Sequence, residues 1–340
     1  MSLDNFRPSF IYYQLRATPK PVPYEGNDLS GKTALITGGN AGLGFECGRQ
    51  LLRLKLSYLI ITSRSLSRAE AARKLLLADK TTQRVNPNAK VDVYELDQER
   101  HEYISAFVEK LKESTAYLDI ALLNAAINTP KIEKSPYGRE RTIQINHVST
   151  SLMSLLLLPL LEACPRKPAN LTVVAGGTNT WTTLPAKHHP KMIHWMGDPA
   201  SKGFDVYANY HNSKLLNLFW VQALAERVSG ADVVVNAVCP AMADTNLFRE
   251  YPRWLMGFAK LIYFRWITWS AEACARVLTS GVVKGRDGHG SLTTGIGVTL
   301  PFNPLLFNDE GKGIRERLWN ETIEIFQKEA GFKVDVPAKL

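Results

Sequence analysis

A glycine-rich turn between a short apolar run and a helical pattern constrains the fold of this chain more than any other feature. The run from Thr33 to Thr37 predicts a short buried strand, and Phe45 begins a helical pattern that continues through Leu51. The turn between them holds Gly38, Gly39, Gly42 and Gly44. A strand, a glycine turn and a helix start bind anions, because bare backbone N–H groups and the positive end of the helix dipole converge there. The turn therefore predicts a pyrophosphate site, and a tight turn without a ligand is the alternative.

Strand-like and helix-like segments alternate along the rest of the chain. The expected strands are 33–37, 58–62, 91–96, 118–123, 171–174 and 233–238. The expected helices are 68–77, 99–112, 138–161, 207–228 and 314–328. This alternation predicts an α/β fold, a doubly wound parallel sheet of the Rossmann type with about seven strands, in a single domain over residues 31–340. Residues 1–30, rich in aromatic residues and proline, are expected to form an N-terminal extension that packs on the domain or on a partner subunit.

The composition favours a globular protein with an anionic ligand. The chain of 340 residues has a formal net charge of +9, but no basic run with interleaved aromatic residues points to nucleic acid. Its four cysteines show no CxxC pair and no metal-type spacing, which is typical of reduced thiols in a cytoplasmic protein, and no secretory signal is evident. The apolar run 152–161 is too short to span a bilayer, so it predicts a core helix and no stable membrane insertion.

Three polar residues follow predicted strands, at the edge along which open parallel sheets bind ligands. Arg64 stands about twenty residues past the glycine turn, where such folds choose between cofactors, and an arginine there can pair with the 2′-phosphate of NADP. Asp97 and Asn124 end the third and fourth expected strands. Each residue also has a plainer interpretation, as a solvated arginine, a helix cap or a turn former.

The sharpest catalytic pattern is Tyr210-x-x-x-Lys214. On a helix this spacing places the phenol and the ammonium one turn apart on the same face. A free phenol ionises near pH ~10, and the nearby lysine and the positive nicotinamide of a cofactor are expected to lower that pKa. Tyr210 is then predicted to exchange a proton with the oxygen of a ketone or an alcohol while hydride moves to or from a nicotinamide.

These motifs, in this order, resemble the short-chain dehydrogenase/reductase family. The resemblance covers most of residues 30–250 and extends to Asn146 in QINH and to Pro240-Ala241-x-x-x-Thr245. The remaining segments look most like fungal retinol-dehydrogenase-type members associated with secondary metabolism. Dimers or tetramers are common in the family, so a homo-oligomer is expected unless the extension blocks those surfaces. The implied cofactor is NADP(H), with contacts from Gly38, Asn40, Gly42, Leu43, Gly44, Arg64, Asp97, Asn124, Ala125, Tyr210, Lys214, Pro240, Ala243 and Thr245.

The resemblance also implies a catalytic tetrad, of which this chain keeps three members. Asn146 would anchor a water, Tyr210 would be the acid/base, and Lys214 would tune the tyrosine and bind the nicotinamide ribose. The family serine is missing, because Gly176 stands at its position, and Thr178 is the predicted replacement. Weaker candidates are Trp181, His188, His189 and a hydroxyl of the substrate. The histidines between positions 188 and 194 fit no standard zinc spacing, so no metal is predicted.

The aromatic residues between positions 247 and 269 predict a lid over a bulky hydrophobic substrate, with core packing and shallow membrane contact as alternatives. The leading hypothesis is an NADP-dependent oxidoreductase that interconverts a ketone and a secondary alcohol on a hydrophobic small molecule, in fungal secondary-metabolite biosynthesis. Without the serine, a non-redox cyclase, isomerase or dehydratase on the same scaffold is the main alternative. An inactive cofactor-binding protein is a third hypothesis, and the intact Tyr210 and Lys214 argue against it.

Overall fold

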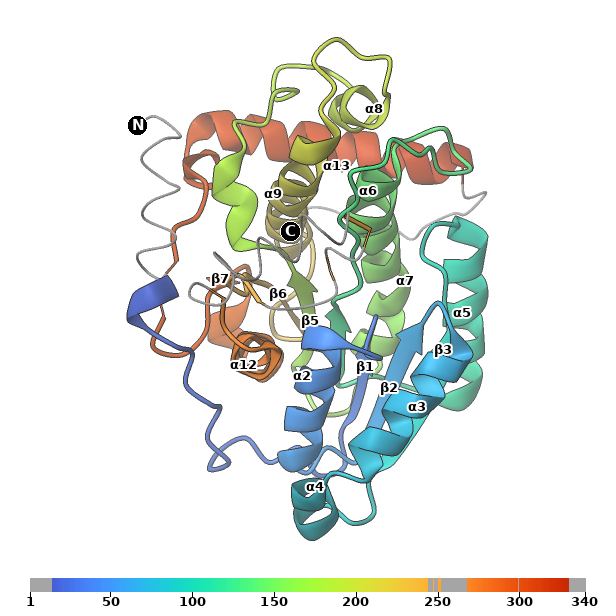
Figure 1. Cartoon of the computed structure of the whole chain (residues 1–340), viewed down its shortest axis with the longest axis vertical. Coiled ribbons are helices and arrows are strands. Elements are labelled where there is room, and N and C mark those ends of the chain that lie inside the picture. The colour runs from blue at the N-terminus through green and yellow to red at the C-terminus, as the bar shows by residue number, and fades with distance from the viewer. Residues whose placement is uncertain (1–13, 244–246, 248–249, 252–267, 299, 330–340) are drawn as a thin grey trace.

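The computed structural model contains one parallel sheet, and it describes residues 14–243, 247, 250–251, 268–298 and 300–329 (Figure 1). Within these residues the sheet has seven strands in the order β3-β2-β1-β4-β5-β6-β7, and every neighbouring pair is parallel. The strands are β1 (Thr33–Ile36), β2 (Tyr58–Ser63), β3 (Lys90–Glu95), β4 (Ile120–Leu123), β5 (Ala169–Val174), β6 (Val233–Val238) and β7 (Leu292–Thr293). The predicted doubly wound Rossmann-type sheet is therefore confirmed.

The direction in which successive strands join the sheet reverses between β1 and β4. Strands β2 and β3 extend the sheet on one side of β1, and β4 to β7 extend it on the other side. The loops after β1 and β4 therefore leave the sheet in opposite directions, and ligands of such folds bind in the crevice that this opens at the carboxyl ends of the strands.

Helices cover both faces of the sheet, as Figure 1 shows. One face carries α2 (Gly42–Arg53), α3 (Leu66–Leu77) and α12 (Ala271–Val282), and the other carries α5 (His101–Ser114), α7 (Thr150–Glu162) and α9 (Val206–Ala225). Along β1, Ala34 and Ile36 pack into the first core layer and Leu35 into the second, because successive side chains of a strand point to opposite faces. Both faces are buried at the centre of the sheet, so β1 and β4 are buried along their whole length and do not alternate, whereas the edge strand β3 carries charged residues.

The predicted helix 138–161 begins later than expected and is not uniform. Glu140 is fully buried, and its carboxylate accepts hydrogen bonds from the backbone N–H groups of Thr142 and Ile143, at 2.7 and 3.2 Å, so the helix starts at Arg141. It runs through α6 (Arg141–Ile143), a π-helical turn η2 (Gln144–Ser149) and α7. The stretch Arg141–Glu162 is long and apolar enough to cross a membrane, but 89% of its most apolar window is buried inside the fold.

Several elements lie where no element was predicted from sequence. They are α4 (Lys80–Val85), α8 (Met192–Gly197), α12 and β7. α8 depends on a distant residue, since the buried carboxylate of Glu321 accepts hydrogen bonds from the backbone N–H groups of Ile193 and His194. The predicted closing helix is α13 (Asp309–Glu329), which packs on α9. Most of the predicted lid 247–269 and part of the extension 1–30 fall outside the described residues, so both remain predictions.

Candidate active site

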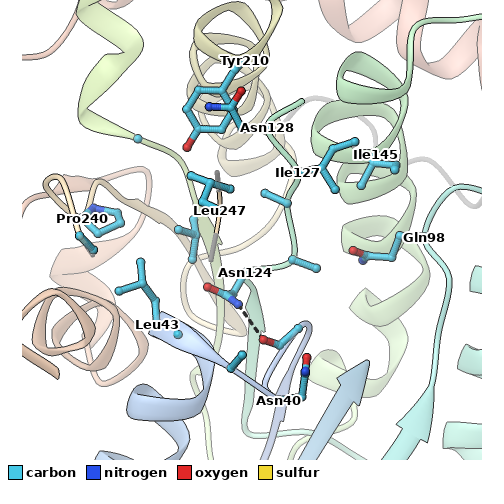
Figure 2. Close-up of a pocket in the computed structure, with 18 of the residues that line it drawn as sticks. Asn40, Leu43, Gln98, Asn124, Ile127, Asn128, Ile145, Tyr210, Pro240 and Leu247 are labelled. Carbon is cyan, nitrogen blue, oxygen red and sulfur yellow. Dashed lines mark hydrogen bonds between the residues drawn. The ribbon is translucent and has the colours of Figure 1, made fainter. Parts of the chain in front are cut away.

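A large cavity opens at the carboxyl ends of the strands, where the order of the sheet reverses. Its volume is about 1030 Å³, and its wall comes from the glycine turn, the ends of β2, β4 and β5, helix α9 and the chain after β6. Figure 2 shows Asn40 at one end of the cavity, Tyr210 at the other and Asn124 between them. The cavity therefore has room for a ligand that extends from the glycine turn to the tyrosine.

The glycine turn presents the N-terminus of α2 to this cavity. Gly38 and Gly42 have φ angles of 65° and 56°, in the left-handed region that favours glycine. Ala41 caps α2 without a side-chain hydrogen bond, and the first turn of the helix holds no acid, so its N–H groups are available to an anion. Gly44 serves packing instead, because a Cβ there would lie 2.6 Å from Asn124 Nδ2 and 2.7 Å from Gly38 O.

Asn124 and Ala125 line the cavity and also hold the glycine turn in shape. The backbone N–H groups of Asn124 and Ala125 donate to Thr37 Oγ1, at 2.9 and 3.0 Å. The Asn124 carboxamide donates to the carbonyl oxygens of Thr37 and Gly38, at 2.9 and 3.3 Å. The expected ligand residue Asn124 is thus first a support for the loop that binds the ligand.

Two arginines lie on the rim of the cavity beside the end of β2. Arg64 was predicted, and Arg68, one turn further along in α3, was not. Both side chains are exposed, and neither guanidinium has a partner among the residues that the structure describes. Arg68 could have been found from its helical spacing to Arg64. Two unpaired guanidinium groups on one rim suit a phosphate group.

The loop after β3 contributes Asp97 and Gln98. Asp97 Oδ1 accepts a hydrogen bond from the backbone N–H of Glu99 at 3.0 Å, as a turn former does. Gln98 follows directly and was missed from sequence; it is 5% exposed, and its Oε1 has no hydrogen-bond partner within the described part of the chain. An unpaired buried carbonyl oxygen is costly, so Gln98 marks a place where a ligand donor can bind.

Tyr210 and Lys214 lie at the far end of the cavity on α9. Lys214 Nζ donates to the carbonyl oxygen of Val174 at 3.0 Å and lies 5.7 Å from the centre of the Tyr210 ring. Burial lowers the pKa of Lys214 to about 8. Burial likewise raises the pKa of Tyr210 above its ordinary value, with smaller contributions from Tyr251 and Cys239. Burial therefore sets the direction of the tyrosine pKa shift among the protein's own residues, and the expected lowering by the lysine and the nicotinamide of a bound cofactor stays a prediction.

Asn146 lies in the π-helical turn η2, and it is not among the residues that line the cavity. Its carboxamide exchanges two hydrogen bonds with the backbone of Ile127, at 2.8 and 2.9 Å, and also donates to Ser213 Oγ at 3.1 Å. Its backbone carbonyl oxygen accepts from Asn217 Nδ2 at 2.8 Å. The side chain of Asn146 thus connects the strand-end loop to α9, and its expected role as a water anchor stays a prediction.

The hydroxyl of Thr178 lies next to the side-chain position that Gly176 leaves open. A Cβ built on Gly176 would lie 3.5 Å from Thr178 Oγ1 and 3.3 Å from Lys214 Cγ. Thr178 Oγ1 is buried and has no hydrogen-bond partner in the described chain, and Thr178 lines the same cavity as Tyr210. The threonine hydroxyl is therefore close to where a serine at position 176 would project.

The chain matches the family model described as short chain dehydrogenase over residues 32–175. A short chain dehydrogenase of Arthrobotrys oligospora is 34% identical over 307 residues, which cover 88% of this chain and 94% of the relative. The short chain dehydrogenase virL of Hypocrea virens is 35% identical over 323 residues, covering 93% and 90%. The chain belongs to the short-chain dehydrogenase family.

Solved structures share the fold of this short-chain dehydrogenase. A short chain dehydrogenase from Burkholderia cenocepacia in complex with NADP has a TM-score of 0.59 at 20% identity, covering 80% of this chain and 99% of that one. The Pseudomonas aeruginosa RhlG/NADP active-site complex has a TM-score of 0.58 at 21% identity, covering 81% and 97%. This chain therefore shares the fold of these two solved structures over most of its length.

The other predicted residues of the dehydrogenase site divide between the cavity and the surface. Asn40, Leu43, Pro240 and Ala243 line the cavity, as does Trp181, whereas Thr245 lies outside the described residues. The histidines at 188, 189 and 194 do not line the cavity, and no group of three metal-binding side chains comes together among the described residues. Lining residues that sequence reasoning missed include Asn128, Tyr207, His211 and Met242, whereas Tyr251 belongs to the predicted lid.

A nicotinamide dinucleotide fits the residues of this site. The open N-terminus of α2 would hold the diphosphate, and the unpaired Gln98 Oε1 would meet a donor of the adenine. Tyr210 and Lys214 would stand at the nicotinamide end. The short-chain dehydrogenase class, the open helix terminus and the length of the cavity support a nicotinamide cofactor.

Proposed function

We propose that this short-chain dehydrogenase is an NADP-dependent oxidoreductase that interconverts a ketone and a secondary alcohol on a hydrophobic small molecule. The observation that carries the proposal is that Tyr210 and Lys214 face the same cavity as the open N-terminus of α2. Ile127, Met242 and Leu247 in the wall support an apolar substrate. The resemblance to fungal retinol-dehydrogenase-type proteins supports a role in secondary-metabolite biosynthesis.

The residues divide the proton chemistry among them, while the bound cofactor would supply hydride to the carbonyl carbon. Because burial raises the pKa of Tyr210, its phenol is protonated at neutral pH, which is the form that donates to a carbonyl oxygen. The ammonium of Lys214 stabilises the phenolate that remains. The hydroxyl of Thr178 would donate a second hydrogen bond to the substrate oxygen.

The preference for NADP rests on charge. Arg64 and Arg68 offer two unpaired cations to a 2′-phosphate, and no acid stands at that rim position to hold the ribose hydroxyls of NAD. The four buried free thiols support a cytoplasmic location, because they suit a reducing compartment. We also propose that the protein forms a homo-oligomer and does not bind nucleic acid.

Two measurements test the proposal. The binding of NADPH and NADH is titrated by nicotinamide fluorescence, and the oxidation of each cofactor is then measured with a panel of bulky ketones. NADPH should bind more tightly and be oxidised. Tyr210→Phe should lower kcat by at least about 10²-fold, because the proton donor is lost. Tyr103→Phe, on a half-exposed surface tyrosine, is the matched control. Full turnover by Tyr210→Phe would exclude the assigned acid.

The non-redox alternative keeps one supporting observation, which is that Gly176 provides no hydroxyl at the position of the family serine. A cyclase, isomerase or dehydratase could still use Tyr210 for proton transfer in the same cavity. Product mass distinguishes the two functions, because reduction adds two hydrogens and rearrangement adds none. Binding of NADPH without oxidation by any ketone would favour this alternative.

A further inference from the structure

The described part of the N-terminal segment reaches the chain that forms one wall of the cavity. Gln14 is 1% exposed, and its Nε2 donates to the carbonyl oxygen of Met242 at 2.8 Å. The backbone N–H of Met242 donates in return to Gln14 Oε1 at 3.1 Å. One carboxamide therefore satisfies both backbone groups of Met242, as a neighbouring strand would.

The same glutamine also binds the chain that enters α12. Trp269 Nε1 donates to the carbonyl oxygen of Gln14 at 2.9 Å, and the backbone N–H of Trp269 donates to Met242 O at 3.0 Å. Each of Gln14, Met242 and Trp269 is thus hydrogen-bonded to the other two, and we call these three residues the Gln14 clasp. Trp269 is 9% exposed, so these bonds lie in a largely dry environment that strengthens them.

Apolar side chains join the clasp to both functional ends of the cavity. Ala17 of the N-terminal segment packs against the buried cluster around Trp269, and Leu43, Trp181 and Met242 pack against the same cluster. Leu43, Trp181 and Met242 all line the cavity. A shift of Met242 would therefore be felt at the cofactor turn and at the substrate wall.

We infer that Gln14 is a positioning residue of the active site, which makes the N-terminal segment part of that site. The expected changes in KM and kcat rest on the proposed function, whereas the expected change at Met242 does not. Met242 follows β6 in a stretch whose backbone groups need partners from outside the sheet, and Gln14 supplies them. The hydrogen bonds given above join Gln14 to Met242 and Trp269, so Gln14 should act on ligand binding more than on proton transfer.

Two variants of the full chain test the inference. Gln14→Leu keeps the approximate size of the side chain and removes its hydrogen bonds to Met242, and Leu15→Ala is the matched control, because Leu15 is adjacent and 60% exposed. The readouts are the spectrum of ¹³C-methyl methionine, with the Met242 signal assigned through Met242→Leu, the Kd of NADPH, and KM and kcat for a ketone. Thermal melting reports stability separately.

In Gln14→Leu we expect the Met242 methyl signal to shift, and KM for the ketone to rise about five- to tenfold with kcat within about twofold. Leu15→Ala should leave all of these unchanged. A lower Tm with an unmoved Met242 signal and an unchanged KM would show a purely structural role and overturn the inference. If none of the ketones is reduced by the wild type with NADPH, the proposed function fails. The Met242 signal and the Kd of NADPH still decide the role of Gln14 in that case.

Discussion

The hydroxyl of Thr178 lies beside the place that a serine at position 176 would use, with its oxygen buried and without a partner among the described residues. Thr178→Val removes the hydroxyl and keeps the shape of the side chain. Loss of one such donor is expected to lower kcat by about 10²- to 10³-fold, and Thr178→Ser should keep most of the activity. Steady-state kinetics with a ketone that the wild type reduces measures the effect.

A second substitution makes the role of Thr178 separable from damage to the loop. Gly176→Ser, introduced into Thr178→Val, should restore part of kcat, because it returns a hydroxyl to this loop. The new Cβ would lie 3.3 Å from Lys214 Cγ, so one of the two side chains must shift by a few tenths of an ångström. Unchanged kcat in Thr178→Val would show that the substrate oxygen needs no donor from this loop.

Burial of Lys214 should make the stability of the protein depend on pH. Burial lowers its pKa from 10.5 to about 8, so between these values the unfolded chain binds more protons than the folded chain. The contribution of this group to the free energy of unfolding therefore rises with pH across that window. Burial of the charged lysine destabilises the folded protein by about 3 kcal/mol at most, and this destabilisation is fully present below pH 8. In melts without cofactor, Tm of Lys214→Met relative to the wild type should increase as pH falls from 10 to 8. Exposed Lys202→Met is the control, and a pH-independent difference would contradict a buried cation.

At the scale of elements, the start of α3 sets the predicted cofactor preference. Arg64 precedes this helix, Arg68 lies in its first turn, and both face the cavity rim. The double variant Arg64→Ala/Arg68→Ala should weaken NADPH binding by about 10- to 100-fold and leave NADH binding within about twofold, because only the 2′-phosphate loses its partners. Fluorescence titrations with both cofactors measure this.

Arg73→Ala provides the control on the same helix, since Arg73 pairs with Glu70 away from the cavity. Equal weakening of NADH and NADPH would mean that the two rim arginines act on the shared part of the dinucleotide and not on the 2′-phosphate.

Elements whose cause is local were predictable from sequence, and elements whose cause is distant were not. The glycine turn and the apolar strands carry their own signals, and both were found. The late start at Arg141 depends on the buried carboxylate of Glu140, and α8 depends on Glu321 from α13. The π-helical turn that carries Asn146 has no sequence period of its own.

At the scale of the whole molecule, the parallel sheet explains why the site was largely predictable. Strands that run in one direction place their carboxyl ends on one edge, so Asp97, Asn124 and Gly176 had to meet there. Gln98 and Gln14 could not be found in this way. The role of Gln98 depends on which side chain of a loop is left unpaired, and the role of Gln14 depends on a contact 228 positions along the chain.

The C-terminal helix packs on the second core layer through aromatic contacts, among them a tryptophan stack. Trp319 of α13 stacks on Trp220 of α9 with ring centres 4.7 Å apart, and the Arg227 guanidinium lies 4.1 Å from the Trp319 ring. Trp319→Ala should lower the free energy of unfolding by about 3–5 kcal/mol, because the indole is 5% exposed and the cavity left behind cannot close fully. Denaturant unfolding measures this, with 67% exposed Phe307→Ala as the control. Because no residue of α13 lines the cavity, kcat/KM of the folded variant should stay near that of the wild type. A large loss of activity without a loss of stability would refute this separation.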